Sequence, residues 1–249
     1  MRGSQMLADT CVIVSFYDGR PSEELVRLLR QLQLARMGAQ FETRVVVNSD
    51  RNVRPQLPAD LSPIGLDIRE NTGFNIGAWD HGWRQNAGFD FYLFLQDECE
   101  IVRADWLKRY RALLSDPKIG LVSESLLFWR NWGQFKEKWP EAHDECVALG
   151  AHRGIALGKS PTHAQTLALG VSAACLAATD GFCVAEGKIP AVAGEVMFSR
   201  HCIDQRYAIT QSAWRPFEYF RHPQWASMRD EATGPAWHLS RAVKQLAGP

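Results

Sequence analysis

The sequence predicts an α/β fold built on a doubly wound, mostly parallel sheet, and two observations lead to this prediction. Short apolar runs rich in β-branched and aromatic residues alternate, over the first half of the chain, with stretches of helical periodicity. Strands that alternate with helices form parallel sheets. Three of the apolar runs also end in polar clusters, at residues 15–18, 48–50 and 96–100. Ligands of such sheets bind beyond the carboxyl ends of the strands.

The first strand and helix occupy residues 11–32. Residues 11–17, CVIVSFY, are a continuous apolar run that predicts a buried strand. After a turn, Ser22 can cap a helix that has Glu23 and Glu24 in its first turn. Leucines then recur at the spacing of one helix face. They are Leu25, Leu28, Leu29 and Leu32.

The same alternation continues through the first half of the chain. Residues 44–47, RVVV, predict a second buried strand, followed by a proline-containing loop. Residues 71–83, NTGFNIGAWDHGW, join a glycine-rich turn to a helix, and residues 91–95, FYLFL, predict the third strand. Asp105 is expected to cap another helix before a fourth strand at residues 119–123.

Periodicity weakens in the second half. Residues 128–165 hold three Trp, four Gly and mixed charge, which predicts long loops or an irregular insertion. Residues 167–178 are expected to be strand-like, residues 195–203 helical, and residues 207–210 a short strand. A chain of 249 residues is long enough to form one full core. We therefore expect a single domain over residues 1–249.

The composition excludes several classes of partner. With 28 Lys and Arg against 28 Asp and Glu, the formal net charge is zero, so we expect no nucleic-acid partner. No apolar run is long enough for a transmembrane segment, and residues 1–10 do not resemble a signal peptide. The six scattered cysteines are typical of reduced thiols. We expect a cytoplasmic protein, either free or peripheral at the inner face of the membrane.

The segment Gln96-Asp97-Glu98 has the strongest chemical signal. Carboxylates just past a buried strand pay a desolvation penalty, so they usually hold a cation or hydroxyl groups. A hard divalent cation takes oxygen ligands and typically shares them with substrate phosphates. The alternative is a solvated turn after an edge strand. It is disfavoured because FYLFL is typical of a central strand.

Taken in order, these segments resemble the GT-A nucleotide-sugar glycosyltransferases of the large family-two type. The resemblance runs from about residue 11 to about residue 210 and is carried by several loose motifs. They are CVIVSFY, RVVVNSD, ENTGFNIGAWDHGW, FYLFLQDE, Asp180-Gly181-Phe182 and Gly194-Glu195. NTGFNIGAW is most similar to bacterial rhamnosyltransferase-like members. The resemblance implies a GT-A fold with a nucleotide-binding half at residues 8–125, and an acceptor-binding half with an aromatic tail at residues 126–249.

The resemblance also implies how a nucleotide-diphosphate sugar would be bound. Asp97 corresponds to the acid that binds the ribose, Asp50 to the acid that binds the base, and Glu98 to the acid that coordinates Mg²⁺ or Mn²⁺ at the diphosphate. Glu100 is an alternative metal ligand. The end of the first strand lies where the nucleobase packs, and the glycine-rich loop lies beside the nucleotide. These two segments contribute Ser15, Phe16, Tyr17, Asn71, Gly73 and Asn75.

In the family, a Gly-Phe turn is followed by an acidic pair that opens a helix and supplies the general base. Gly194-Glu195 stands at that position, 13 residues beyond Phe182, and Gly replaces one acid. Glu195 is therefore the expected base. The alternative is a carboxylate favoured at a helix N-terminus by the helix dipole. The implied reaction moves a sugar, with inversion, to a hydroxyl of a glycan, a lipid-linked acceptor or a small molecule.

A second hypothesis is a non-catalytic GT-A-like domain that binds a nucleotide or a glycan. It is motivated by Gln96, which stands where the family usually has Asp, and by Gly194. Six of the nine Trp lie beyond the nucleotide-binding half. Under either hypothesis they could stack on sugar rings, and the alternative for each is packing in the core or a lid.

Overall fold

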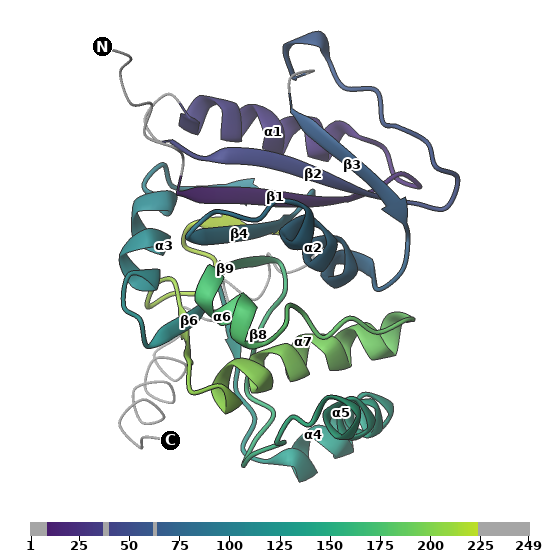
Figure 1. The fold of residues 1–249 in the computed structure, drawn as a ribbon, viewed down its shortest axis with the longest axis vertical. Helices are drawn as coiled ribbons and strands as arrows, with labels where there is room; N and C mark the ends of the chain where they lie inside the picture. The colour runs from purple at the N-terminus through teal and green to yellow at the C-terminus, as the bar shows by residue number, and fades with distance from the viewer. Residues whose placement is uncertain (1–8, 37–39, 62–63, 224–249) are drawn as a thin grey trace.

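The computed structural model of the chain describes residues 9–36, 40–61 and 64–223. A seven-stranded sheet runs through it, with the strands in the order β10-β6-β9-β4-β1-β2-β3 (Figure 1). Neighbouring strands are parallel, except that β9 runs antiparallel to both β4 and β6. The predicted α/β fold with a doubly wound, mostly parallel sheet is therefore confirmed.

The sheet draws its strands from both halves of the chain. β1 is buried along nearly its whole length because it lies between β2 and β4. The strands of the sheet are β1 (Thr10–Tyr17), β2 (Glu42–Ser49), β3 (Gly65–Glu70), β4 (Phe91–Gln96), β6 (Ile119–Ser123), β9 (Ala168–Ser172) and β10 (Ala208–Gln211). Two short ribbons are formed by β5 (Glu100–Ile101) with β11 (Phe220–Arg221), and by β7 (Leu126–Leu127) with β8 (His163–Ala164).

Helices cover both faces of the sheet, and the alternation of side chains along β1 separates two cores. Val12 and Val14 pack in a cluster with α1 and α3, whereas Ile13 packs on the other face with α2, α6 and α7. This is the period-two pattern of a strand that is buried on both sides. The helices on the two faces are α1 (Glu23–Arg36), α2 (Phe74–Gln85), α3 (Trp106–Leu114), α6 (Ala173–Ala178) and α7 (Lys188–Asp204).

The prediction of an irregular insertion at residues 128–165 is wrong. Two helices, α4 (Trp132–Lys138) and α5 (Pro140–Arg153), occupy most of this segment, and α5 packs against α7. Each helix buries only a few residues, such as Phe135 in α4 and Cys146 in α5. A helix that packs through so narrow a seam lacks the broad apolar stripe that sequence patterns detect.

Two other predictions need correction. The segment predicted as a loop after the second strand contains β3, an edge strand paired only with β2 and partly exposed along its length. Residues 167–178 are strand-like only as far as Ser172. The Ser172 hydroxyl then accepts a hydrogen bond from the backbone N–H of Cys175 and caps α6.

Two expectations from composition can be compared with the described residues. None of the described helices has the length and apolar character needed to cross a lipid bilayer. All six cysteines are free and buried in this structure. Trp225 and Trp237, in the predicted aromatic tail, lie outside the described residues.

Candidate functional site

Parallel pairing brings the polar ends of β1, β2 and β4 to one edge of the sheet. In the strand register, Ser15 of β1 stands opposite Gln96 of β4, and Tyr17 of β1 stands opposite Asn48 of β2. The backbone N–H of Asp97 also donates to the carbonyl of Ser15 at 3.1 Å. The three polar clusters of the sequence therefore meet where ligands of doubly wound sheets bind.

The glycine-rich loop is joined to the end of β1. Ser15 is fully buried, and its hydroxyl donates to Oδ1 of Asn75 at 2.9 Å. Gly73 caps α2 with a φ of 69°, in the left-handed region that favours glycine. A Cβ at Gly73 would also come within 2.5 Å of Val184. Asn71 precedes this turn and is partly exposed.

At the end of β2, the candidate nucleobase side is made by Tyr17 and Asp50. The Tyr17 hydroxyl donates to Oδ2 of Asp50 at 2.6 Å. This bond and the negative charge of Asp50 raise the pKa of Tyr17. Phe16 points to the opposite side of β1, where its ring is 2% exposed in the core with α1. Only the backbone of Phe16 can therefore contact a ligand at the strand end, because its ring is buried in the core.

Asp97 and Glu98 differ sharply in their surroundings. Asp97 is only 6% exposed, and burial together with the adjacent charge of Glu98 raises its pKa to about 6. The Glu98 side chain is 30% exposed and pairs with Arg20 Nη1 at 2.6 Å. Arg27 of α1 donates to the Glu98 carbonyl at 3.0 Å and so holds the backbone of this turn.

His222 was not predicted, and it lies against Glu98. Its Nε2 is 3.4 Å from Oε2 of Glu98, and its side chain is 1% exposed. His222 comes from the far end of the described chain, in a segment without helical or strand periodicity. No local pattern could have found it. Arg20 lies in the turn after β1, where a cation beside the polar strand ends was a usable signal.

A buried carboxylate holds the segment that carries His222. Glu124, which follows β6, is 0% exposed, and its Oε2 accepts the backbone N–H groups of Tyr219 and Phe220 at 2.9 and 3.2 Å. Its Oε1 accepts the hydroxyl of Tyr110 at 2.7 Å. Burial raises the pKa of Glu124. These hydrogen bonds and the pairing of β5 with β11 hold the segment that places His222 beside the turn after β4.

Two side chains of types that ligate metals, Glu98 and His222, lie next to each other at the turn after β4. In the described part of the chain, no group of three or more His, Cys, Asp or Glu side chains is arranged to bind a metal. The Glu98 carboxylate and the His222 imidazole nevertheless lie together, and Asp97 directly precedes Glu98 in the sequence. Mg²⁺ is usually bound through one or two carboxylates and substrate phosphates, and imidazole is a ligand for transition metals. The Glu98 carboxylate is a ligand type of Mg²⁺ and Mn²⁺, and a substrate diphosphate would have to supply most of the other ligands. Glu100 is exposed in β5, opposite Arg221.

Glu195 lies in the middle of α7, which begins at Lys188 and ends at Asp204. The expectation that Glu195 opens a helix is therefore wrong, and so is the alternative role at a helix N-terminus. The missed first turns of α7 contain Pro190 and Gly194, which obscured the helical pattern. Glu195 Oε1 accepts the backbone N–H of Thr166 and Oε2 accepts the Thr166 hydroxyl, both at 2.9 Å. Its side chain is 17% exposed, and burial raises its pKa to about 7.

His163 borders the same carboxylate. Its Nδ1 lies 2.7 Å from the carbonyl of Pro161. Since a carbonyl only accepts, the proton of the neutral ring is on Nδ1. Burial lowers the pKa of His163 to about 4, so the ring is neutral at physiological pH. Its Nε2, with a free lone pair, then lies 3.9 Å from Glu195 Oε1.

Close packing against a neighbouring backbone explains why residue 194 is glycine. A Cβ on this residue would lie 2.3 Å from the carbonyl oxygen of Cys183, which is backbone and cannot rotate away. α7 therefore approaches the chain after the Gly-Phe turn too closely for any side chain here. The structure thus supplies a physical reason why this chain has Gly where the resemblance leads us to expect an acid.

We expect Gly194→Ala to lower the free energy of unfolding by about 1–3 kcal/mol, the usual cost of overpacking. This loss should appear although Ala is the better helix former by about 1 kcal/mol. Gly133→Ala in α4 is a matched control, since its Cβ would meet only the Asn131 side chain at 3.2 Å. Urea denaturation measures both changes. A Gly194→Ala protein as stable as the wild type would show that the contact with Cys183 is not tight.

The raised pKa of Glu195 should make stability depend on pH. Its ordinary value of 4.5 is raised in the folded state to about 7, so the folded protein binds this proton more tightly. The resulting stability is fully present below about pH 4.5 and is lost as pH rises through about 7. We expect Glu195→Gln to remove this pH dependence, worth up to about 3 kcal/mol, because the neutral amide resembles the protonated acid at every pH. Urea midpoints of the two proteins at pH 5 and pH 8 should converge at the lower pH and separate at the higher. Parallel curves would contradict the raised pKa.

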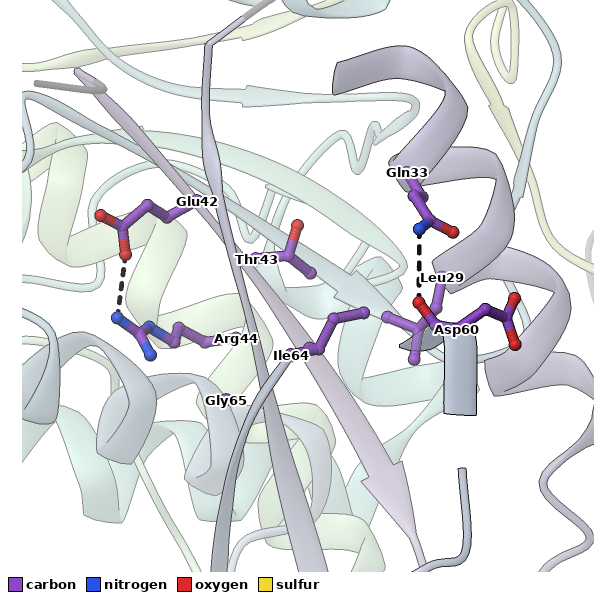
Figure 2. Close-up of a pocket in the computed structure, with 8 residues that line it drawn as sticks. All are labelled: Leu29, Gln33, Glu42, Thr43, Arg44, Asp60, Ile64 and Gly65. Atoms are coloured by element: carbon purple, nitrogen blue, oxygen red, sulfur yellow. Dashed lines mark hydrogen bonds and ion pairs between the residues drawn. The ribbon is translucent and has the colours of Figure 1, made fainter. Parts of the chain in front are cut away.

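A cavity of about 410 Å³ lies at the other end of the parallel strands. Figure 2 shows its lining, which comes from α1, the start of β2, and the turn before β3. Two contacts join polar groups of the lining: Arg44 pairs with Glu42 at 2.8 Å, and Gln33 donates to the Asp60 carbonyl at 3.3 Å. Among the described residues, the Thr43 hydroxyl and Arg44 Nε have no hydrogen-bond partner. Because the cavity opens at the amino ends of the strands, it is separate from the candidate site.

Comparison with known proteins identifies the fold. No protein-family model and no curated protein sequence matches the chain. A mannosyltransferase from Pyrobaculum calidifontis, solved with GDP-Man and Mn²⁺, has a similar structure, with a TM-score of 0.51 and 14% identity over 96% of this chain. This chain spans 65% of that protein's length. A variant of Drosophila β1,4-galactosyltransferase 7, solved with manganese, UDP-Gal and xylobiose, has a TM-score of 0.51 and 12% identity, over 90% of this chain and 75% of that one.

These structures share with this chain the sheet and its flanking helices, over nearly all of the chain in the first case. At this level of identity the likeness concerns the fold. The chain has the GT-A fold of nucleotide-sugar glycosyltransferases.

Proposed function

We propose that the chain is a glycosyltransferase that moves a sugar from a nucleotide-diphosphate donor to an acceptor hydroxyl, with inversion at the anomeric carbon. One observation carries the proposal. Gln96 is bonded to Thr166, which holds Glu195, and Gln96 is followed directly by Asp97 and Glu98. A direct transfer requires a base beside a diphosphate-binding cluster, because the acceptor oxygen must reach the anomeric carbon in line with the leaving group.

The residues at the strand ends would bind the donor. Asp97, which is buried and acidic, would accept hydrogen bonds from the ribose hydroxyls, and Asp50 with Tyr17 would border the base. The loop of Asn71 and Gly73 would lie beside the nucleotide. Each role is supported by the position of the residue at the carboxyl edge of the sheet, where such ligands bind.

Glu98 and His222 would hold Mg²⁺ or Mn²⁺. When bound, the cation would stabilise the negative charge of the leaving diphosphate. Arg20, now paired with Glu98, has a guanidinium that can also bind a phosphate through charged hydrogen bonds. The mannosyltransferase and the galactosyltransferase described above were both solved with manganese.

Glu195 would act as general base. A carboxylate with a pKa of about 7 is partly ionised at neutral pH and is a stronger base than an ordinary glutamate. It would take the proton of the acceptor hydroxyl as that oxygen attacks the sugar. Both carboxylate oxygens are held by Thr166, so the base is oriented before the acceptor arrives.

We further propose that the enzyme is of the family-two, rhamnosyltransferase-like type. The support is the segment NTGFNIGAW at residues 71–79, whose turn is built around Gly73 and tied to β1 through Asn75. The acceptor would be a hydroxyl of a glycan, a lipid-linked sugar or a small molecule.

The proposal is tested by donor binding and its dependence on metal. UDP-, GDP- and dTDP-sugars are screened by thermal shift with and without Mn²⁺, since a ligand that binds the folded state raises the melting temperature. We expect at least one donor to raise it only with Mn²⁺ present. Glu98→Gln should abolish this effect, whereas the exposed Glu137→Gln should retain it.

Each remaining outcome has a meaning. If Glu100→Gln and not Glu98→Gln abolishes the Mn²⁺ effect, the metal ligand is Glu100. Donor binding without release of nucleoside diphosphate, for any acceptor class, would support a non-catalytic nucleotide- or glycan-binding domain. No response to any donor would contradict the proposal.

A further inference from the structure

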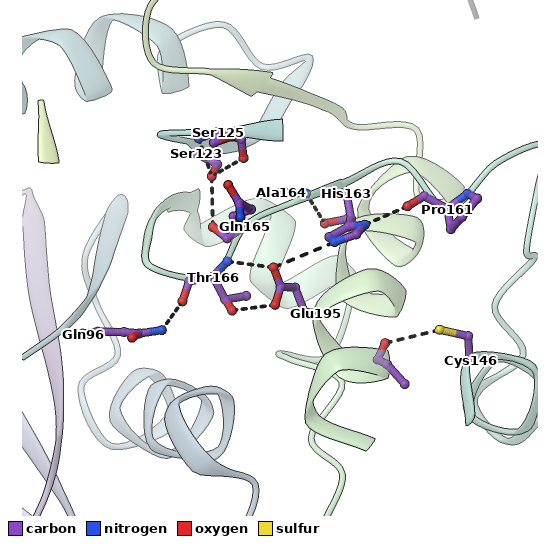
Figure 3. A network of polar contacts seen from close by, with 12 residues as sticks. Gln96, Ser123, Ser125, Cys146, Pro161, His163, Ala164, Gln165, Thr166 and Glu195 are labelled. Atoms are coloured by element: carbon purple, nitrogen blue, oxygen red, sulfur yellow. Dashed lines mark hydrogen bonds and ion pairs between the residues drawn. The ribbon is translucent and has the colours of Figure 1, made fainter. Parts of the chain in front are cut away.

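The connection between β8 and β9 is anchored on two sides (Figure 3). On one side, the backbone N–H of Gln165 donates to the Ser125 carbonyl, and the Ser123 hydroxyl donates to the Gln165 carbonyl, both at 3.0 Å. On the other side, the backbone N–H of Ala164 donates to the hydroxyl of Ser199 in α7 at 3.0 Å. Thr166, which follows Gln165, therefore extends from a backbone that is held on both sides.

Thr166 donates a hydrogen bond to each oxygen of the Glu195 carboxylate. Its backbone N–H reaches Oε1 and its hydroxyl reaches Oε2, so the carboxylate cannot rotate without breaking one bond. Ser199 lies four residues after Glu195, on the same side of α7. Two bonds to Glu195 and one to Ser199 thus join the β8–β9 connection to this helix face.

Gln96 holds the other side of Thr166. Its Nε2 donates to the Thr166 carbonyl at 2.5 Å, and its backbone N–H donates to the Leu167 carbonyl at 3.1 Å. A carboxylate at position 96 would face this carbonyl with an acceptor instead of a donor. The contact therefore requires a side chain that donates a hydrogen bond, and this explains physically why Gln and not an acid stands at position 96.

We infer that Thr166 is a positioning residue that couples Glu195 to the end of β4, with Gln96 as the link to Asp97 and Glu98. The inference rests on the proposed function only for the role of Glu195 as base. The effect is that a change at the turn after β4, where the donor diphosphate would bind, is transmitted to the orientation and proton affinity of Glu195. The connection from β4 to Glu195 runs through the Gln96 side chain, the Thr166 backbone and the Thr166 hydroxyl.

The charges around Glu195 allow this coupling to be measured. Burial raises the pKa of Glu195, and the two bonds from Thr166 oppose this by stabilising the anion. On the β8 side, His163 is neutral and places its Nε2 3.9 Å from Oε1. Among the residues that the structure describes, His163 is the only ionisable side chain within ion-pair distance of Glu195. Apart from burial, the groups that set the pKa of Glu195 are therefore the two hydrogen-bond donors of Thr166.

The test is a pH titration of Glu195 followed by carbon NMR of labelled glutamate side chains, with Glu195→Gln identifying the signal. We expect Thr166→Val to raise the pKa by about 1–2 pH units, the equivalent of one lost hydrogen bond to a charged group. Thr166→Ser keeps the hydroxyl and should restore the wild-type value. If Val disturbs folding, Thr166→Ala also removes the hydroxyl hydrogen bond to Glu195, with a smaller side chain. An unchanged pKa in Thr166→Val and Thr166→Ala would overturn the inference.

The coupling to β4 has its own readout. In the wild type, saturation with a nucleoside diphosphate and Mn²⁺ should move the Glu195 signal, and in Gln96→Met, saturated in the same way, this response should be lost. A response retained in Gln96→Met would overturn the role of Gln96. If no nucleotide binds at all, the proposed function fails, but the titration of the Thr166 variants still decides whether Thr166 positions Glu195.

Discussion

Replacement of Glu195 by Gln is expected to slow sugar transfer about 10²–10⁴-fold, the usual contribution of a general base. The amide retains the shape of the side chain, and its oxygen can still accept the Thr166 N–H while its NH₂ donates to the Thr166 hydroxyl. The variant should therefore fold and bind donor as the wild type does, so that the loss appears in kcat. It lacks only the capacity to take the proton of the acceptor hydroxyl.

The measurement is the rate of nucleoside diphosphate release from the donor found by thermal shift, with acceptor and Mn²⁺ present. Glu145→Gln is the matched control, because Glu145 is an exposed glutamate on the neighbouring helix α5. Its rate should equal that of the wild type. Unchanged turnover in Glu195→Gln would remove Glu195 as the base, whatever the donor proves to be.

Replacement of Asp97 by Asn is expected to weaken nucleotide binding about 10–100-fold at pH 8. A hydrogen bond to a charged acceptor is worth about 1.5–3 kcal/mol, and about 1.4 kcal/mol corresponds to a factor of ten. The pKa of Asp97 is raised to about 6, so the carboxylate is ionised at pH 8 and largely protonated at pH 5. The difference between Asp97→Asn and the wild type should therefore shrink at pH 5.

Calorimetry with a nucleoside diphosphate and no added metal at the two pH values measures this effect, because a cation bound beside Asp97 would itself lower the pKa of that carboxyl. Asp204→Asn is a suitable control, since Asp204 is exposed at the last residue of α7 and is not among the residues proposed to bind the nucleotide. Equal affinities of Asp97→Asn and wild type at pH 8 would contradict the placement of the ribose at Asp97. A constant difference at both pH values would contradict the raised pKa instead.

The two residues that depart from the resembled pattern are explained by contacts, and these bear on the choice between an enzyme and a binding domain. Gly194 has the backbone of Cys183 against it, and Gln96 donates to the Thr166 carbonyl. Neither residue therefore has to be interpreted as the loss of a catalytic group. Glu195 keeps two donors and a raised pKa without a second acid beside it.

Some of this architecture was readable from local patterns. The apolar runs that become β1, β2, β4 and β6 are continuous because helices cover both faces of the sheet or neighbouring strands flank them, and continuous burial leaves a continuous pattern. β3, α4 and α5 were missed because an edge strand and two narrowly packed helices bury few residues. A segment that buries little is weakly marked in its sequence.

The sequence by itself determined the succession of β1, α1, β2, α2, β4, α3 and β6, the polar ends of β1, β2 and β4, and Asp97, Glu98 and Glu195 as candidate residues. Only the tertiary structure decided which residues surround them. Thr166 and His163 meet Glu195, and His222 meets Glu98, across 29, 32 and 124 positions of the chain. The reason is physical: periodicity records whether a residue faces the core or the solvent, whereas hydrogen-bond partners and pKa values depend on which distant segments the sheet brings together.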